Sequence, residues 1–147
     1  MTGTVKPQVE LEHVNRLRLA LTRVERALRQ NAGGGVTPSQ YAVLTTLDRH
    51  GRMALGELAQ HEGVSPPSIT RIVQVLEEKG LVSRTVSASD HRVATVAATA
   101  MARRTVARIR RQRNAWLAQR MAELNSGELD DLNRGTAALE HILELGR

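Results

Sequence analysis

The sequence contains no cysteine and almost no aromatic side chains. Among its 147 residues, Tyr41 and Trp116 are the only aromatic ones. The lack of cysteine excludes a disulfide scaffold, cysteine-ligated zinc and thiol-based catalysis or redox sensing. With two rings in the chain, a module that stacks the bases of single-stranded nucleic acid on aromatic platforms is not expected. The core must instead be built from Leu, Val, Ile and Ala.

Long apolar runs and catalytic motifs are missing as well. No apolar stretch approaches the ~18 residues of a membrane-spanning helix, and residues 1–11 lack the apolar core of a signal peptide. We therefore expect a cytoplasmic protein. The five histidines form no HxxxH or HExxH pair, and the three glycines at 33–35 lack the lysine of a phosphate-binding loop. We predict no enzyme activity, no bound metal and no cofactor.

What the sequence does have is arginine, concentrated in the middle of the chain. The net charge is +6, and of 21 basic residues only Lys6 and Lys79 are lysines. Residues 64–113 carry ten basic and three acidic side chains, whereas residues 114–147 carry a net charge of −3. Arginine favours planar, bidentate contacts with phosphates and guanines. The distribution indicates a local basic surface and an anionic partner.

Apolar spacing and turn residues predict a mainly α-helical chain with one β-hairpin. Thr37 and Gln40 form a capping box, and Ser65 and Ser126 are expected to cap two later helices. The predicted helices span 8–31, 37–50, 55–61, 65–79, 99–125 and 128–145, and the hairpin strands span 81–86 and 93–97. The terminal helices have apolar stripes with little in one chain to bury against, so we expect them to pack on a second copy.

The segment from Leu55 to Lys79 has the spacing of a helix-turn-helix. Ala59 is small enough to let two helices cross closely, and Gly63 can adopt the positive φ of a tight turn. Ile69 then fills the angle between the helices. The same spacing also occurs in ordinary packed helix pairs, so on its own it indicates DNA binding only moderately.

The second helix of this segment has a polar face opposite its apolar one. Arginine pairs with guanine and glutamine with adenine in the major groove, and the first helical turn can bind phosphate. The alternative is an ordinary solvated helix face. The predicted major-groove residues are Ser65, Pro67, Ser68, Thr70, Arg71 and Gln74.

The hairpin that follows favours the DNA-binding interpretation, because it completes a winged helix-turn-helix. An arginine at the tip of a wing can enter the minor groove. Asp90 is repelled by phosphate, so we expect it to hold Arg92 or Arg84 through a charge-assisted hydrogen bond. The alternative is a simple polar turn. The predicted wing residues are Arg84, Asp90, His91 and Arg92.

With these motifs the sequence resembles the MarR family of bacterial transcriptional regulators. The resemblance rests on Leu58-Ala59, Ser68-Ile69-Thr70-Arg71, the element Lys79-Gly80-Leu81-Val82 and the wing motif Asp90-His91-Arg92. It implies a winged helix-turn-helix lobe at 34–100, flanked by dimerisation helices at 1–33 and 101–147. It further implies that the homodimer binds a palindromic operator, with Arg92 in the minor groove. The stretch Ala98-Thr99-Ala100 departs from the family pattern, which has Leu-Thr followed by Gly.

The resemblance also implies a small effector, often an aromatic acid or phenolic compound, that releases a repressor from DNA. Its pocket would lie between the winged lobe and the dimer helices. Aromatic rings and an arginine that can pair with a carboxylate are the chemically suitable contacts for such a ligand. The alternative is that the two rings belong to the core and the arginine to the surface. The candidate ligand residues are Tyr41, Trp116 and Arg16.

Two alternatives to a sequence-specific regulator remain open from the residues alone. A nonspecific nucleoid-type DNA binder would explain the charge but not the polar face of the second helix. A winged-helix module for protein interactions would explain the fold without DNA. The stripe of Arg104, Arg108 and Arg111 is interpreted as a solvated face that steers DNA at long range, rather than as a set of phosphate contacts.

Overall fold

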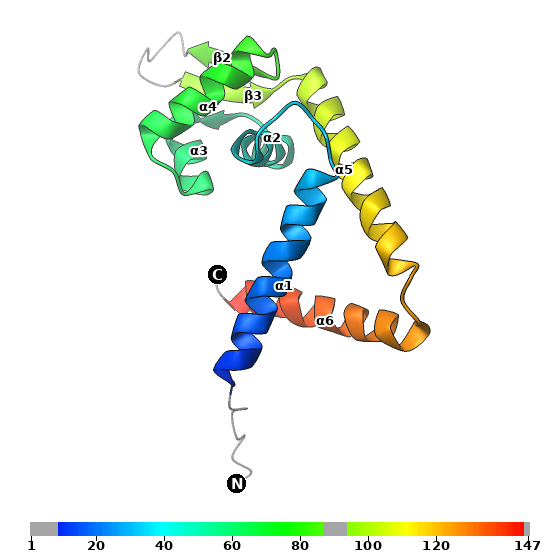
Figure 1. The fold of residues 1–147 in the computed structure, drawn as a ribbon. Coiled ribbons are helices and arrows are strands. Elements are labelled where there is room, and N and C mark those ends of the chain that lie inside the picture. The colour runs from blue at the N-terminus through cyan, green and yellow to red at the C-terminus, as the bar shows by residue number, and fades with distance from the viewer. Residues whose placement is uncertain (1–8, 87–93, 146–147) are drawn as a thin grey trace.

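The computed structural model describes residues 9–86 and 94–145 and confirms a mainly helical chain with a small sheet. In Figure 1 the middle of the chain forms a compact lobe, from which α1 and α5 lead away, while α6 turns back from the lower end of α5. The helices are α1 (Leu11–Gln30), α2 (Pro38–His50), α3 (Leu55–Glu62), α4 (Pro66–Glu78), α5 (Ala100–Met121) and α6 (Ser126–Leu145).

The hairpin belongs to a three-stranded antiparallel sheet in the order β1-β3-β2. Strands β2 (Val82–Val86) and β3 (Ala94–Ala98) are the two predicted ones, each displaced by one residue from its predicted start. The third strand, β1 (Met53–Ala54), was not predicted, because two residues are too short to show an alternating pattern. It pairs with β3 and ties the start of α3 to the hairpin.

The core is aliphatic, as the composition requires, and it lies within the lobe. Ile69, Val73 and Leu76 of α4 are buried against residues of α2, α3, the sheet and the start of α5. Ala59 is buried at the helix crossing, and Gly63 has φ 64° and ψ 32°, the left-handed conformation that the turn needs. The predicted helix-turn-helix packing is therefore confirmed.

Helix caps agree with the prediction at α2 and differ at α4 and α6. Thr37 and Gln40 form the reciprocal capping box. Ser65 stands at the N-cap position of α4, but its hydroxyl pairs with that of Ser68 instead of a backbone N–H, so the predicted side-chain cap is wrong. The cap before α6 is Asn125, which exchanges two hydrogen bonds with Glu128, so Ser126 is the first helical residue and not the cap.

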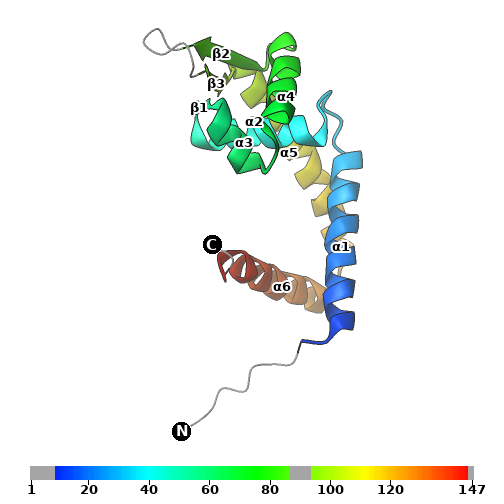
Figure 2. The same ribbon diagram turned by 90° about the vertical axis from the view of Figure 1, so that its left-hand side faces the viewer.

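The two terminal helices bury none of their residues fully. Between α1, the end of α5 and α6 lies an apolar groove of about 740 Å³, lined by Leu17, Leu21, Val24, Leu132, Leu139 and Ile142 among others. Figure 2 shows the C-terminal end of α6 pointing away from α1, so the two helices do not pack along each other. Within the described ranges 9–86 and 94–145, no helix is long and apolar enough to cross a membrane.

Candidate nucleic-acid interface

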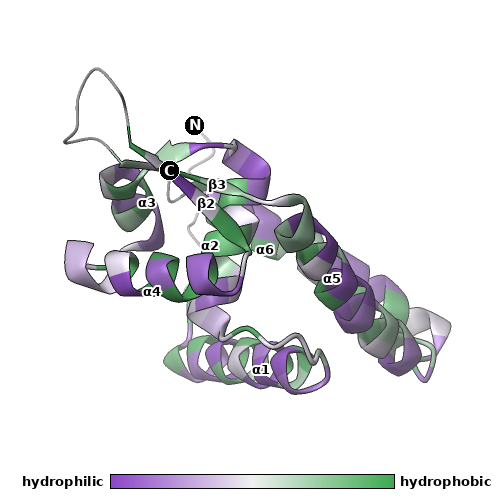
Figure 3. Ribbon diagram, turned by 90° about the horizontal axis from the view of Figure 1, so that it is seen from above, coloured by the Kyte–Doolittle hydropathy of each residue, from purple (hydrophilic) through white to green (hydrophobic). Residues whose placement is uncertain are grey.

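One face of α4 is exposed and carries every residue predicted to read the major groove. Seen from above in Figure 3, α4 lies along the outside of the lobe, with the hairpin beside it. The predicted residues Ser65, Pro67, Ser68, Thr70, Arg71 and Gln74 are all exposed, while the opposite side of the helix is buried. The amphipathic pattern therefore orients α4 with its polar face outward.

The polar groups on this face differ in how strongly they are engaged within the helix. Thr70 donates its hydroxyl hydrogen to the carbonyl oxygen of Pro66 at 2.9 Å, and Ser65 and Ser68 share a hydrogen bond of 2.9 Å. The Gln74 amide donates to the Glu78 carboxylate at 3.3 Å, which is a long and weak hydrogen bond. Replacing it with a hydrogen bond to the edge of a DNA base would therefore cost little free energy. Arg71 is exposed and forms no ion pair with any residue in the described part of the chain.

The hairpin presents two different faces, and Arg84 lies on the inner one. Arg84 pairs across the strands with Val96, which is fully buried, so the Arg84 side of the hairpin is the side that faces the core. Arg84 is accordingly half-buried. Thr85 and Thr95 are the next pair along and occupy the solvent face. The other predicted wing residues, Asp90, His91 and Arg92, lie outside the described residues.

Two cations hold the glycine loop that joins α1 to the lobe. Lys79, at the C-terminal end of α4, donates to the carbonyl oxygen of Gly35 at 2.8 Å and to the Gln40 side chain at 3.2 Å. Arg108 of α5 donates to the carbonyl oxygens of Gly33 at 3.0 Å and Gly34 at 3.4 Å. Neither role was predicted from the sequence, because backbone carbonyl acceptors leave no signal in a residue pattern.

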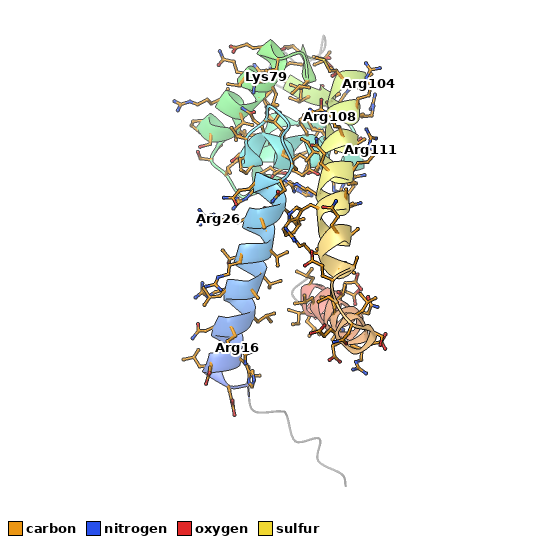
Figure 4. All side chains as sticks on the ribbon, turned by 45° about the vertical axis from the view of Figure 1, so that its right-hand side comes forward. Arg16, Arg26, Lys79, Arg104, Arg108 and Arg111 are labelled. Atoms are coloured by element: carbon orange, nitrogen blue, oxygen red, sulfur yellow. The ribbon has the colours of Figure 1, made fainter. Side chains whose placement is uncertain are left out.

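The remaining α5 arginines divide between packing and solvent. Arg113 stacks on the Tyr41 ring at 4.3 Å from its centroid, and Arg110 lies 4.0 Å from Asp48. Arg104 and Arg111 are exposed. Figure 4 shows them following one another along α5, with Arg108 between them and Lys79 near the upper end. The predicted stripe is therefore present, although its central member binds the glycine loop.

Comparison with known proteins identifies the family. Residues 36–94 match the pattern of the MarR family. The chain is 41% identical over 117 residues to the uncharacterized HTH-type transcriptional regulator Mb0904 of Mycobacterium bovis, a match that covers 79% of this chain and 82% of the relative. The chain belongs to the MarR family. This membership makes it a DNA-binding transcriptional regulator in its general class.

Solved structures agree on the fold of this MarR-family chain. The YusO protein of Bacillus subtilis is 25% identical with a TM-score of 0.73, and the match covers 91% of this chain and 99% of that one. A MarR family protein from Bacillus stearothermophilus gives a TM-score of 0.75 at 21% identity, over 93% and 99% of the two chains. At this level of identity, the second likeness concerns the fold alone.

The three candidate ligand residues of this MarR-family chain lie on different helices. Tyr41 of α2 lines a cavity of about 70 Å³ between the lobe and α1, together with Arg29, Val36, Ile109 and Arg113. Trp116 is half-buried on α5 with Arg120 at 5.8 Å from its ring centroid, and Arg16 is exposed on α1. Among the described residues, neither of these two lines the Tyr41 cavity, so the single chain does not bring the three together.

Proposed function

We propose that this MarR-family regulator binds a palindromic double-stranded operator as a homodimer, with α4 in the major groove and the hairpin in the flanking minor groove. The major-groove set is Ser65, Pro67, Ser68, Thr70, Arg71 and Gln74, and the wing set is Arg84, Asp90, His91 and Arg92. The observation that carries the proposal is the exposed polar face of α4. An arginine without an ionic partner among the described residues and a weakly held glutamine stand there on a well-packed helix.

The homodimer is supported by the apolar groove between α1, α5 and α6. Leu17, Leu21 and Val24 are 43–46% exposed, and Ile142 is 56% exposed. Monomeric soluble proteins rarely keep so continuous an apolar surface in water. A second copy presenting the same helices would cover it, so 1–33 and 101–147 are proposed as the dimerisation segments around the DNA-binding lobe at 34–100.

For regulation we propose repression that a small aromatic acid or phenolic compound relieves. The arrangement of Tyr41 with Arg113 and Arg29 supports an aromatic anion, because it offers a ring and two guanidinium groups. A cavity of about 70 Å³ is smaller than the ~150 Å³ that accommodates benzene. Ligand entry therefore requires the lobe to shift relative to α1, a movement that would change the spacing of the two α4 helices in a dimer. Arg16 and Trp116 remain candidate contacts in the dimer.

The experiment that tests the DNA-binding proposal compares two duplexes. Affinity is measured for the DNA upstream of the protein's own gene and for a scrambled duplex of equal length, across a salt series. A preference of about 10³-fold or more at physiological salt is expected. Arg71→Ala should reduce operator affinity by roughly 10-fold or more, with little change for the scrambled duplex, because one bidentate base contact contributes about 1–3 kcal/mol.

Arg111→Ala is the matched control, because it removes the same charge from an exposed site on α5. It should weaken binding to both duplexes slightly and equally. If Arg71→Ala and Arg111→Ala behave alike on both duplexes, α4 is not the reading helix. If the wild-type protein prefers neither this upstream duplex nor any sequence selected from a random pool, it is a nonspecific DNA binder.

A further inference from the structure

Arg52 lies directly before β1 and reaches across the solvent face of the hairpin. Its Nη1 atom donates to the hydroxyl of Thr85 at 2.9 Å and to that of Thr95 at 3.4 Å. The Thr95 hydroxyl in turn donates to the carbonyl oxygen of Thr85 at 3.3 Å. Thr85 and Thr95 are directly opposite each other in the register, so one guanidinium nitrogen braces both strands at one point.

The brace leaves most of the Arg52 guanidinium available. An arginine side chain has five N–H donors, and the Nε and Nη2 groups of Arg52 have no hydrogen-bond partner in the described part of the chain. Arg52 and Thr85 are both exposed, and no carboxylate within 9–86 or 94–145 forms an ion pair with Arg52. The Nε–Nη2 edge is the fork that binds the two oxygens of a phosphate group.

The place of this group on the hairpin indicates which phosphate it would meet. A hairpin in the minor groove, which is about 6 Å wide, has one phosphate backbone along each of its faces. The core face, on which Arg84 lies, turns toward the lobe, and the edge strand β2 contacts α4. The solvent face, with Arg52 at the β1 edge of the sheet, turns toward the other backbone. Strand β1 is the edge of the sheet opposite β2, the strand that contacts α4.

We propose that Arg52, held by Thr85 and Thr95, is a binding site for one DNA backbone phosphate on the strand beyond the wing. This inference rests on the proposed DNA-binding function and adds a contact outside the α4 and hairpin-tip residues assigned above. The site is pre-organised, since the threonine brace orders the long side chain before DNA arrives. Its ligand class is a phosphodiester, and it contributes affinity and register but no base preference.

The test measures operator affinity of the full-length protein between 50 and 200 mM salt for the wild type, Arg52→Gln and Arg111→Gln. Glutamine keeps a donor for the threonine hydroxyls and removes the charge. Each phosphate contact contributes about 0.9 to the slope of log affinity against log salt. In a dimer, Arg52→Gln should lower the slope by about 1.8. When the salt is raised from 50 to 200 mM, the variant should therefore lose about 12-fold less affinity than the wild type loses. Arg111→Gln should leave the slope nearly unchanged.

A second measurement locates the phosphate and separates contact from bracing. Single phosphates of the operator are replaced by neutral methylphosphonates, and each duplex is titrated with the wild type and Arg52→Gln. One phosphate per half-site, on the strand beyond the wing, should weaken wild-type binding and leave Arg52→Gln binding unchanged.

Arg52→Gln could lower the affinity with an unchanged salt slope and with no phosphate whose neutralisation affects the wild type alone. That result would refute the phosphate contact and leave Arg52 with only its structural role in bracing the hairpin. Equal wild-type binding to operator and scrambled DNA, with the slope change retained, would instead refute the sequence-specific function and keep the phosphate site. Thermal unfolding of each variant establishes that the fold is intact.

Discussion

Shortening Leu21 should weaken the proposed homodimer without unfolding the lobe. Leu21 lies on α1, lines the groove between α1 and α6, and is 46% exposed in the single chain. The lobe has its own core, to which α1 contributes no buried residue. Leu21→Ala therefore removes apolar surface that a second copy would cover in the proposed dimer.

The magnitude follows from that exposed fraction. Fully burying a leucine side chain contributes about 1.5–3 kcal/mol, so burying the remaining 46% of Leu21 contributes about 1 kcal/mol per copy. A symmetric interface counts this contribution twice, which gives about 2 kcal/mol for the dimer. The dimer dissociation constant should then rise about 30-fold.

Sedimentation equilibrium over a dilution series measures this constant directly. Val86→Ala provides the matched control, because Val86 is 50% exposed but lies on β2, in the lobe and outside the groove. It should leave the dissociation constant within about threefold of the wild-type value. A wild-type chain that stays monomeric at high concentration, or a Leu21→Ala dimer as tight as the wild type, would refute the groove as the dimer interface.

Four further predictions concern the caps, the turn and the glycine loop, the first three measured by chemical denaturation. Thr37→Ala should cost about 1 kcal/mol of unfolding free energy by removing the α2 cap. Asn125→Ala should cost about the same when α6 is docked in the dimer, whereas Ser126→Ala should be nearly neutral; the reverse order would contradict the assigned cap. Gly63→Ala should cost about 1–2 kcal/mol, because its φ of 64° strains any residue with a Cβ although nothing lies within 4 Å of that atom. Arg108→Ala should raise amide hydrogen exchange at 33–35, and unchanged exchange would show that the loop needs no anchor.

The sequence predicts the elements that have strong local signals. Thr37-Pro38 with Gln40 begins α2 as expected, Gly63 makes the turn, and Ile69 fills the angle between α3 and α4. These are short-range patterns in which residue type and backbone geometry are directly linked. The polar face of α4 is predicted for the same reason, because helical spacing alone determines which residues share a face.

Long-range partners are what the sequence does not predict. Strand β1 exists because β3 pairs with it, and two residues carry no pattern of their own. Asn125, and not Ser126, is the N-cap of α6, because the Glu128 side chain accepts a hydrogen bond from the Asn125 backbone N–H. Both residue types are good N-caps, so the sequence alone does not decide between them. Arg52 bonds to residues more than 30 positions away, so its role becomes visible only when the strands are brought together.

The number of basic residues at 64–113 overstates how many of them are available to contact DNA, because several are engaged within the protein. Lys79 and Arg108 donate hydrogen bonds to carbonyl oxygens of the glycine loop, and Arg113 stacks on Tyr41. Because Lys79 is the C-cap of α4 and Arg108 lies on α5, the loop is held both by the proposed reading helix and by the helix that leads toward the proposed dimer region. Ile109 closes it further, since a Cβ at Gly34 would lie 2.5 Å from its Cδ1 atom. These cations thus tie the loop after α1 to α4 and α5, and in the proposed dimer this tie would couple the position of α1 to the spacing of the two α4 helices.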